Sequence, residues 1–427
     1  MLSEVKKKEH KNSIFLIFIS GCIFFLGRAF EPFISGDSLN HVTIAKYIVQ
    51  SNDWLNLYLN GSVYLKKPPF YFWLIALSFK VFGISAFAAR IPIALFGIFD
   101  AILVYLLALE LFKDRNTSLL ASMFFIVNFH VIRLTSIVRM ESVITFFILL
   151  NLYLLLKRRY ILSGVALGLG ILIKGPIAFF GVASFILYKL FIKEYEFISG
   201  KFFLSLFIAA IVGGWWYVYK LLVDPYFFDV FVNKQILHRI TGELSEGTVR
   251  GQLFYFKRLL SRFLPGLPFF FLGLFFAFKD NLFKRNKLWI LVFIYLVVVF
   301  IAIDIPKEKF TRYLYYLYPM ASLFAAYSVD RLNIEKHVFA GFAAIIFGFL
   351  VAVMFYPKPF HHPPKEAKVC FKICDKLKHI NCSAIFKGLS QLQISYLNFS
   401  CIDNIASKPC VIVERKGDNC IVKTLSP

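Results

Sequence analysis

The feature that most constrains this chain is a series of long apolar runs along most of its length. A membrane-spanning helix needs about 20 apolar residues to cross roughly 30 Å of hydrocarbon. Runs near that length follow one another with short polar connections, and they predict about eleven spans. The predicted spans are residues 13–27, 91–112, 118–134, 142–156, 161–173, 176–190, 202–222, 263–278, 288–303, 313–329 and 337–355.

The composition agrees with a membrane protein. The 427 residues are 59% hydrophobic with a mean hydropathy of +0.69, which is more apolar surface than a soluble domain can bury. We therefore predict an all-α polytopic membrane protein. The net charge of +23 would suggest nucleic acid in a soluble chain, but here the cations are scattered between apolar runs. Membrane lipids and an anionic lipid substrate are the expected partners, and nucleic acid is not.

The basic clusters predict the topology. Lys and Arg are enriched in cytoplasmic loops, and all the clusters fall on one side only if the apolar segment 69–83 does not cross. That segment is short, aromatic and proline-led, so we expect it to lie along the outer interface. The N-terminus is then cytoplasmic in the inner membrane. The clusters are residues 6–11, 113–115, 157–159, 193–201, 279–287 and 331–336.

The first apolar run also resembles a signal peptide, because basic residues precede it and Ile19-Ser20-Gly21-Cys22 mimics a lipoprotein cleavage site. The run continues beyond Cys22, however, and nothing downstream has the pattern of a soluble mature chain. We expect an uncleaved first span.

The segment after residue 355 has a different character. It alternates strand-like pieces at 384–386 and 411–413 with a helix-like stretch at 367–378, which predicts a small α/β or α+β domain over 356–427 beside a transmembrane domain over 1–355. The topology places this domain outside, where disulfides are plausible. Six of the seven cysteines lie in it: Cys370, Cys374, Cys382, Cys401, Cys410 and Cys420.

The first external loop, residues 31–90, gathers charged and aromatic residues where a membrane segment meets water. Charges so close to hydrocarbon are costly, so they usually anchor a helix end or form a site. The pattern comprises Asp37, Asp53-Trp54, Asn60-Gly61, Tyr64, Lys67-Pro68-Pro69, Trp73, Phe82-Gly83 and Arg90. It resembles the first external loop of the glycosyltransferase-C superfamily, in particular the lipid A aminoarabinose transferases and the more distant protein O-mannosyltransferases.

The resemblance implies a glycosyltransferase-C fold and transfer of a sugar from a polyprenyl phosphate on the extracytoplasmic face. In that family the acid matching Asp37 assists the acceptor nucleophile, and attack on an anomeric carbon does need a carboxylate to take or orient a proton. The alternative is that Asp37 only caps the helix that follows. Many relatives carry a second acid where this chain has Ser38, which weakens the case for a metal held by an acidic pair.

Lys67 matches the family lysine that contacts the donor's lipid phosphate. A cation placed there stabilises the charge that grows on the leaving phosphate, and the two following prolines keep the chain extended. Lys66 occupies a position that is acidic in the aminoarabinose transferases. This difference argues against assuming their zinc site here.

Two further external segments match superfamily elements. Arg139-Met140-Glu141 resembles the element that supplies a second acid, which would position the acceptor or stabilise positive charge on the sugar ring; alternatively these residues only close a helical hairpin. Lys174 lies in a Leu-x-Lys-Gly-Pro turn, and the turn itself is explained by its Gly-Pro break. The break does not explain Lys174 itself, a lone cation between two apolar helices, so we expect Lys174 near the donor phosphate.

Late in the chain, Lys309-Phe-Thr-Arg312-Tyr313 resembles the family's basic element before a proline-containing span. Arg312 can hold a phosphate with two parallel donors. We predict Lys67, Lys174, Lys309 and Arg312 as the phosphate-binding set, with Tyr64, Arg139, His238 and Tyr313 as possible positioning residues. The alternative for these cations is that they snorkel to outer-leaflet head groups.

The sequence therefore predicts an inverting-type membrane glycosyltransferase that uses a polyprenyl-phosphate sugar, with Asp37 and Glu141 as catalytic acids. The acceptor is a lipid, a glycan or a protein. No cofactor is required, because lysine and arginine can neutralise a monophosphate; a divalent metal is possible but not indicated. The rival hypotheses are a transporter or flippase of lipid-linked sugars and a membrane scaffold protein.

Overall fold

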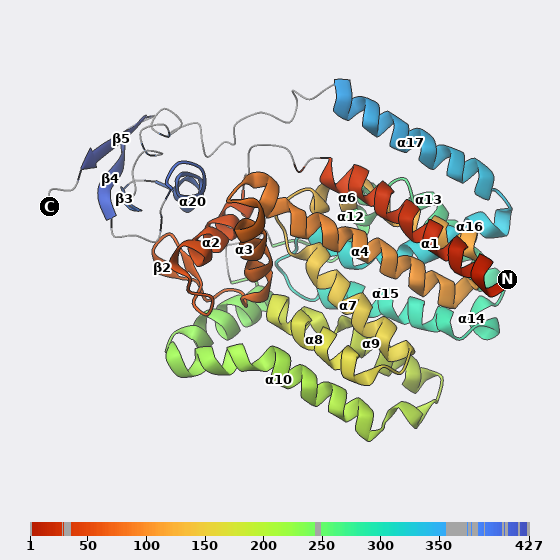
Figure 1. Ribbon diagram of the computed structural model, residues 1–427. Helices are drawn as coiled ribbons and strands as arrows, with labels where there is room; N and C mark the ends of the chain where they lie inside the picture. Colours follow the sequence, from red (N-terminus) through yellow and green to blue (C-terminus); the bar gives the residue numbers. More distant parts are fainter. Residues whose placement is uncertain are drawn as a thin grey trace.

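The computed structural model describes residues 2–27, 29, 36–243, 249–355, 374, 377, 383–387, 389–403, 405, 409–416 and 419–424. These residues form a bundle of long helices, a group of short elements at one end of it, and a small domain with a sheet beside that group (Figure 1). The predicted all-α membrane fold with a small C-terminal α/β or α+β domain is confirmed.

The bundle consists of α1 (Leu2–Gly21), α4 (Ala86–Phe112), α5 (Arg115–Ile126), α6 (Phe129–Thr135), α7 (Glu141–Leu156), α8 (Tyr160–Lys174), α9 (Phe180–Phe191), α10 (Gly200–Val223), α13 (Leu267–Lys279), α15 (Leu288–Asp304), α16 (Tyr318–Leu332) and α17 (Glu335–Phe355). Shorter helical segments connect them: η1 (Cys22–Leu26), η2 (Gly175–Phe179), η3 (Tyr195–Phe197), η4 (Asp229–Leu237), α11 (His238–Thr241), α12 (Phe254–Arg262), α14 (Leu282–Arg285) and η5 (Thr311–Tyr316).

Four helical segments of the described chain are long and apolar enough to cross a membrane: Glu9–Leu26, Ala86–Phe112, Tyr160–Phe191 and Gly200–Val223. The pairs α5 with α6 and α12 with α13, bent by 64° and 112°, would bring the number up to six. The sequence prediction of about eleven spans exceeds this count. The difference arises because other apolar runs form helices of only 10–17 residues, among them α7 and α15, or are interrupted by bends.

Small residues let α4 pack at the centre of the bundle, against α1, α5 and α7. Ala94, Ala101 and Ala108 are fully buried along it. Without a strong hydrophobic drive between helices in lipid, close packing of such residues is what holds them together.

Glycines bring α8 and α10 into backbone contact. A Cβ atom at Gly164 would lie 2.3 Å from the Ser205 carbonyl oxygen, and one at Gly213 would lie 2.7 Å from the Gly168 carbonyl oxygen. Any side chain at these positions would push the two helices apart. The contact therefore fixes the position of α8, whose last residue is Lys174.

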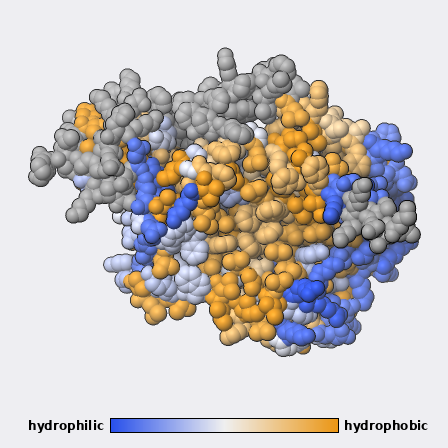
Figure 2. All heavy atoms as spheres, in the orientation of Figure 1, coloured by the Kyte–Doolittle hydropathy of each residue, from blue (hydrophilic) through white to orange (hydrophobic). Residues whose placement is uncertain are grey.

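Connections that carry the predicted cytoplasmic clusters meet at one end of the bundle, where α14 and the N-terminus also lie (Figure 1). Polar contacts join them: Lys157 with Glu110, Asn286 with the Leu111 carbonyl, Lys287 with Glu194, and Thr117 with Asp330. Helices α2 and α3 lie at the opposite end of the bundle. The surface agrees with this arrangement, because apolar residues cover the middle of the bundle and polar residues gather toward its two ends (Figure 2).

The described residues of the predicted first external loop form α2 (Ser38–Ser51), the hairpin of β1 (Tyr58–Leu59) and β2 (Ser62–Val63), and α3 (Phe70–Phe82). Asn60 and Gly61 turn the hairpin with φ of 54° and 83°, the left-handed conformation that Asn-Gly turns favour. At 13 residues, or about 20 Å, α3 is too short to cross the membrane. It agrees with the interfacial helix expected for segment 69–83.

The C-terminal domain holds a three-stranded sheet of β3 (Ser383–Lys387), β4 (Pro409–Lys416) and β5 (Asn419–Thr424). Strand β3 runs parallel to β4, and β5 runs antiparallel to it. Helix α20 (Gln391–Ser400) lies in the connection from β3 to β4, as a parallel pair requires a crossover. Cys374 and Cys401 form a disulfide. Most of the expected helix 367–378, together with Cys370 and Cys382, lies outside the described residues.

Candidate functional site

A polar cavity of about 530 Å³ opens where the first external loop meets the end of the bundle. We call it the polar cavity. It is built by segments far apart in the sequence: the start of α2, residues 59–67, the start of α7, the end of α8, η4, η5 and the start of α20. Its charged lining residues are Asp37, Lys66, Lys67, Arg139, Glu141, Lys174 and Arg312.

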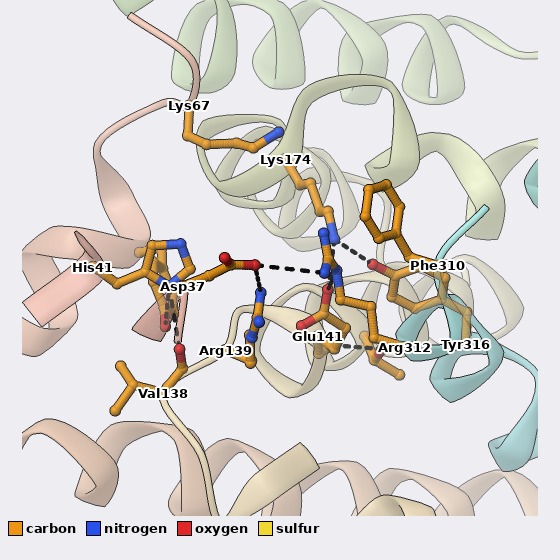
Figure 3. A network of polar contacts seen from close by, with 12 residues as sticks. Asp37, His41, Lys67, Val138, Arg139, Glu141, Lys174, Phe310, Arg312 and Tyr316 are labelled. Carbon is orange, nitrogen blue, oxygen red and sulfur yellow. Dashed lines mark hydrogen bonds and ion pairs between the residues drawn. The ribbon is translucent and has the colours of Figure 1, made fainter. Parts of the chain in front are cut away.

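Asp37 lies immediately before α2, at the position of a helix cap, yet its side chain makes no capping hydrogen bond. Instead its carboxylate is 57% exposed and turns into the cavity, with Oδ2 3.0 Å from Arg139 Nη1 and 3.9 Å from Arg312 Nη1 (Figure 3). The structure thus contradicts the alternative in which Asp37 serves only as a cap.

The environment of Asp37 keeps its carboxylate ionised. Partial burial raises the pKa of Asp37, but the guanidinium of Arg139, by charge and by hydrogen bond, and then that of Arg312 lower it, so the pKa lies below its ordinary value. An opposite charge within hydrogen-bond distance favours the charged form. Asp37 is therefore a carboxylate at neutral pH.

Glu141 is the first residue of α7, and its side chain is only 2% exposed. Its Oε1 accepts a hydrogen bond from Lys174 Nζ at 2.9 Å and lies 3.5 Å from Arg312 Nε. Lys174 Nζ also donates to the Tyr316 hydroxyl at 2.8 Å and lies 4.8 Å from the centre of the Tyr313 ring. One buried acid thus holds two cations from α8 and η5 in fixed positions (Figure 3).

Lys67 approaches from the first external loop, just before the two prolines, and its Nζ lies 3.4 Å from Gln235 Oε1. Gln235 belongs to η4 and is buried. In Figure 3 the Lys67 ammonium group points toward Lys174. Two cations from separate elements therefore approach the same part of the site.

A second, apolar cavity of about 190 Å³ adjoins this region, and we call it the apolar cavity. Its lining includes Ile177, Phe180, Phe231, Ile236 and Ile303. It shares Lys67, Lys174, Gln235 and Tyr313 with the polar cavity. The shared cations therefore lie at the boundary between the polar cavity and the apolar cavity.

Eight of the predicted site residues line the polar cavity: Asp37, Tyr64, Lys67, Arg139, Glu141, Lys174, Arg312 and Tyr313. Lys309 does not. It is 3% exposed, pairs with Asp304, and borders a side cavity of about 460 Å³ together with Arg133, Arg250 and Arg262. His238 also lies apart, at the end of η4, where its Nε2 is 3.6 Å from Glu243.

Three residues that the sequence reasoning did not single out belong to this region. His41 and Gln235 line the polar cavity, and Tyr316 bonds Lys174. Burial, followed by the charge of Arg139, lowers the pKa of His41 to about 4, so its imidazole is neutral at pH 7; its Nδ1 lies 3.1 Å from the Val138 carbonyl. His41 follows Asp37 by four residues, one helical turn, and that spacing was the available signal.

The carboxylates of the site are surrounded by cations. Among the described residues, no three or more His, Cys, Asp or Glu side chains gather in a way that could hold a metal ion. Arg139 and Arg312 occupy the space next to Asp37, and Lys174 and Arg312 that next to Glu141. The arrangement suits an anionic ligand, because ionised donors make the strongest hydrogen bonds to phosphate oxygens.

Comparison with known proteins adds three findings. Residues 66–217 match the family model described as dolichyl-phosphate-mannose-protein mannosyltransferase. An uncharacterised protein of Aquifex aeolicus is 30% identical over 303 residues, 68% of this chain and 58% of that protein. The undecaprenyl phosphate-alpha-4-amino-4-deoxy-L-arabinose arabinosyl transferase 2 of Proteus mirabilis is 23% identical over 355 residues, 78% of this chain and 64% of that enzyme. The chain thus spans less than two thirds of both relatives.

A solved structure has the same fold. The crystal structure of ArnT from Cupriavidus metallidurans bound to undecaprenyl phosphate superposes with a TM-score of 0.75 at 14% identity, covering 93% of this chain and 92% of that one. At this identity the likeness concerns the fold alone.

Proposed function

We propose that this chain, a membrane transferase of the glycosyltransferase-C superfamily, moves a sugar from a polyprenyl-phosphate donor to an acceptor bound beside Asp37. The resemblance inferred from the first external loop is confirmed by the family match over residues 66–217 and by the shared fold. Multi-pass membrane character follows from the same comparisons and from the apolar helices.

The observation that carries the proposal is the junction of the two cavities. A polyprenyl-phosphate sugar has an apolar tail, a single phosphate and a hydroxyl-rich head. The apolar cavity suits the tail, the shared Lys67 and Lys174 suit the phosphate, and the polar cavity suits the sugar. A pocket of this size that combines apolar walls with a few placed charges is typical of small-molecule binding.

In the proposed reaction, an acceptor group carrying a proton attacks the anomeric carbon of the sugar. The bond between that carbon and the phosphate oxygen breaks, and its electron pair stays on the phosphate. Lys67, Lys174 and Arg312 stabilise the added charge. Asp37, ionised and facing the cavity, takes or orients the acceptor's proton.

Glu141 has a different role in this proposal. Because it is buried and already paired with Lys174 and Arg312, it acts as a positioning residue that holds the two cations against the donor phosphate. Lys67, Lys174 and Arg312 neutralise the phosphate without a metal, the active site faces the extracytoplasmic side, and the acceptor is a lipid, a glycan or a protein.

The test uses the purified full chain in liposomes with a labelled polyprenyl-phosphate sugar and an acceptor extract. We expect a glycosylated product, identified by mass spectrometry, and far less product from Asp37→Asn although that variant still binds the donor. A wild-type protein that carries the labelled lipid across the bilayer and never forms product would instead be a transporter. A protein that neither binds nor transfers the donor would support the scaffold hypothesis.

A further inference from the structure

The C-terminal domain contributes directly to the polar cavity. Gln391 and Leu392, the first two residues of α20, belong to its lining. They meet Asn40 from α2 and residues of the β1–β2 hairpin there. We call the following group the α20 wall: Asn40, Leu59, Ser62, Val63, Gln391 and Leu392.

The α20 wall belongs to the polar cavity alone, because none of its residues lines the apolar cavity. The residues that the two cavities share come from the other elements: Lys67, Lys174, η4 and η5. A donor whose tail occupies the apolar cavity and whose phosphate rests on the shared cations therefore leaves the α20 wall to the other substrate.

Helix α20 is held against α2 by a buried lysine. Lys46 of α2 is 4% exposed, and its Nζ donates to the Asn398 carbonyl at 2.9 Å, to the Phe399 carbonyl at 3.3 Å and to the Ile402 carbonyl. The Asn398 and Phe399 carbonyls belong to the last turn of α20, which lacks intrahelical donors, and the Ile402 carbonyl lies just beyond it. A cation at the end of a helix is also favoured by the helix dipole. Burial lowers the pKa of Lys46 to about 8, an effect that the nearby Asp403 partly offsets.

A set of side-chain amides and hydroxyls fixes the rest of the contact. Asn60 of the hairpin donates to Ser395 Oγ at 3.0 Å and accepts from Asn398 Nδ2 at 2.9 Å. Ser395 Oγ in turn donates to Asn40 Oδ1 at 2.7 Å. Asn40 lies three residues after Asp37, so the contact reaches the helical turn that carries the proposed catalytic acid.

Further contacts define both ends of α20. Ser390 and Gln393 form a capping box at its start, and the Cys374–Cys401 disulfide lies just beyond its last residue, at the end that Lys46 contacts. With both ends held, the first turn of α20 presents Gln391 and Leu392 to the cavity in a defined position.

We propose that the α20 wall selects the acceptor, with Gln391 and Leu392 as specificity-determining residues, and that the acceptor part it contacts is an uncharged, hydroxyl-bearing sugar residue. The inference rests on the proposed function. Asn40, Ser62 and Gln391 offer amide and hydroxyl groups that both donate and accept, as sugar hydroxyls do, whereas a phosphate is matched by cations. The apolar side chains Leu59, Val63 and Leu392 suit the carbon face of a sugar ring.

The experiment measures initial transfer rates with the full chain in liposomes against two acceptor lipids, one ending in a neutral sugar and one ending in a phosphate. Gln391→Ala and Leu392→Ala are compared with Gln252→Ala, an exposed glutamine that lines neither cavity. We expect the wild type to prefer the sugar acceptor, and the two wall variants to raise its KM about threefold to tenfold, the range for one lost hydrogen bond or packing contact. The donor KM and the control variant should stay unchanged.

Lys46→Met tests the same inference from a distance, because Lys46 lies at the opposite end of α20 from the cavity. It should raise the acceptor KM and leave the donor KM unchanged, while Lys220→Met, at a buried lysine that bonds Asn56 and not α20, should leave the acceptor KM unchanged.

An unaltered acceptor KM and preference in both wall variants, or equal use of the phosphate acceptor by the wild type, would overturn the inference. A wild type that forms no product with any acceptor would instead overturn the proposed function.

Discussion

The two sides of the polar cavity each carry one carboxylate, and the two carboxylates differ in burial and in their partners. On the side of α7, α8 and η5, Glu141 is buried and bonded to Lys174 and near Arg312. On the side of α2, Asp37 is more than half exposed, and its partners are the guanidinium groups of Arg139 and, at longer range, Arg312. A buried ion pair is costly to assemble and rigid once formed, whereas an exposed acid can meet a substrate. On the proposed function, this difference assigns the positioning of the cations to Glu141 and the reaction with the acceptor to Asp37.

The first way to test this comparison is to remove each charge in turn. Asp37→Asn should lower the rate of transfer by roughly 10² to 10⁴, the usual contribution of a general base, without changing the donor KM or the melting temperature. Glu141→Gln should raise the donor KM and lower the melting temperature, because it leaves the buried Lys174 and the partly buried Arg312 with one acid fewer. Steady-state kinetics and thermal unfolding in detergent measure both variants.

The same pair of variants can refute the assignment. If Glu141→Gln lost turnover at an unchanged donor KM and an unchanged melting temperature, Glu141 would be the reacting acid. If Asp37→Asn transferred at the wild-type rate, neither side of the cavity would have the role given to it.

The next largest effect is expected on the buried side. Lys174→Gln removes a cation that bonds Glu141 and Tyr316 and borders both cavities. We expect the transfer rate to fall by about 10² to 10³, as for the loss of one donor to a developing oxyanion. The transfer rate from a truncated donor with a short isoprenoid should fall by the same factor, since the lost interaction is with the phosphate. A loss confined to long-chain donors would mean that Lys174 acts on the tail.

The exposed side should respond to pH. Arg139→Gln removes the main group that lowers the pKa of Asp37 while the opposing effect of burial remains, so the folded pKa rises. The acid limb of the kcat/KM profile should therefore move to higher pH, so that the variant loses more activity than the wild type at acidic pH. One pKa unit corresponds to roughly 1.4 kcal/mol. An acid limb that did not move would show that the profile reports another group.

Lys309 offers a matched control for Lys174, since both were predicted to bind the donor phosphate. Lys309 is buried against Asp304 outside the polar cavity, so Lys309→Gln should cost stability and change the donor KM by less than about threefold. Breaking a buried ion pair typically costs about 3–5 kcal/mol, which thermal unfolding would register. A large rise in donor KM without loss of stability would instead support the sequence prediction that Lys309 binds the donor phosphate.

The smallest effect concerns metal removal. We expect dialysis against EDTA to leave the transfer rate unchanged, because cations of the chain stand next to both carboxylates. A loss of activity that returns on addition of a divalent ion would show that a metal takes part on one side of the cavity.

Much of the fold could be read from the sequence, because apolar runs and basic clusters report the membrane directly. Segment 69–83 was predicted not to cross, from its length and from the distribution of Lys and Arg, and it forms the short helix α3. The strands at 384–386 and 411–413 were predicted from alternation and pair with each other. The division of the apolar runs into separate helices was not predictable. Bends such as the 64° break between α5 and α6 depend on packing against neighbours, which a hydropathy pattern does not contain.

The site shows the same limit. Motifs placed Asp37, Lys67, Glu141, Lys174 and Arg312 on one face of the membrane, and the structure brings them into one cavity. Nothing in the residue types separates Lys309 from Lys174. Asp304 lies only five residues before Lys309, but that spacing does not by itself show that the two side chains pair. Likewise, no motif predicted that α20 would reach the polar cavity, because its contact with α2 joins residues some 350 positions apart.

The sharing of Lys67, Lys174, Gln235 and Tyr313 between the two cavities has a consequence for supply. On the proposed function, a carrier lipid never needs to leave the bilayer to react, since its head reaches the polar cavity while its tail passes through the apolar cavity. Spent and fresh carriers could then exchange by sideways diffusion. Turnover would follow the density of loaded carrier in the plane of the membrane rather than its amount in the surrounding solution.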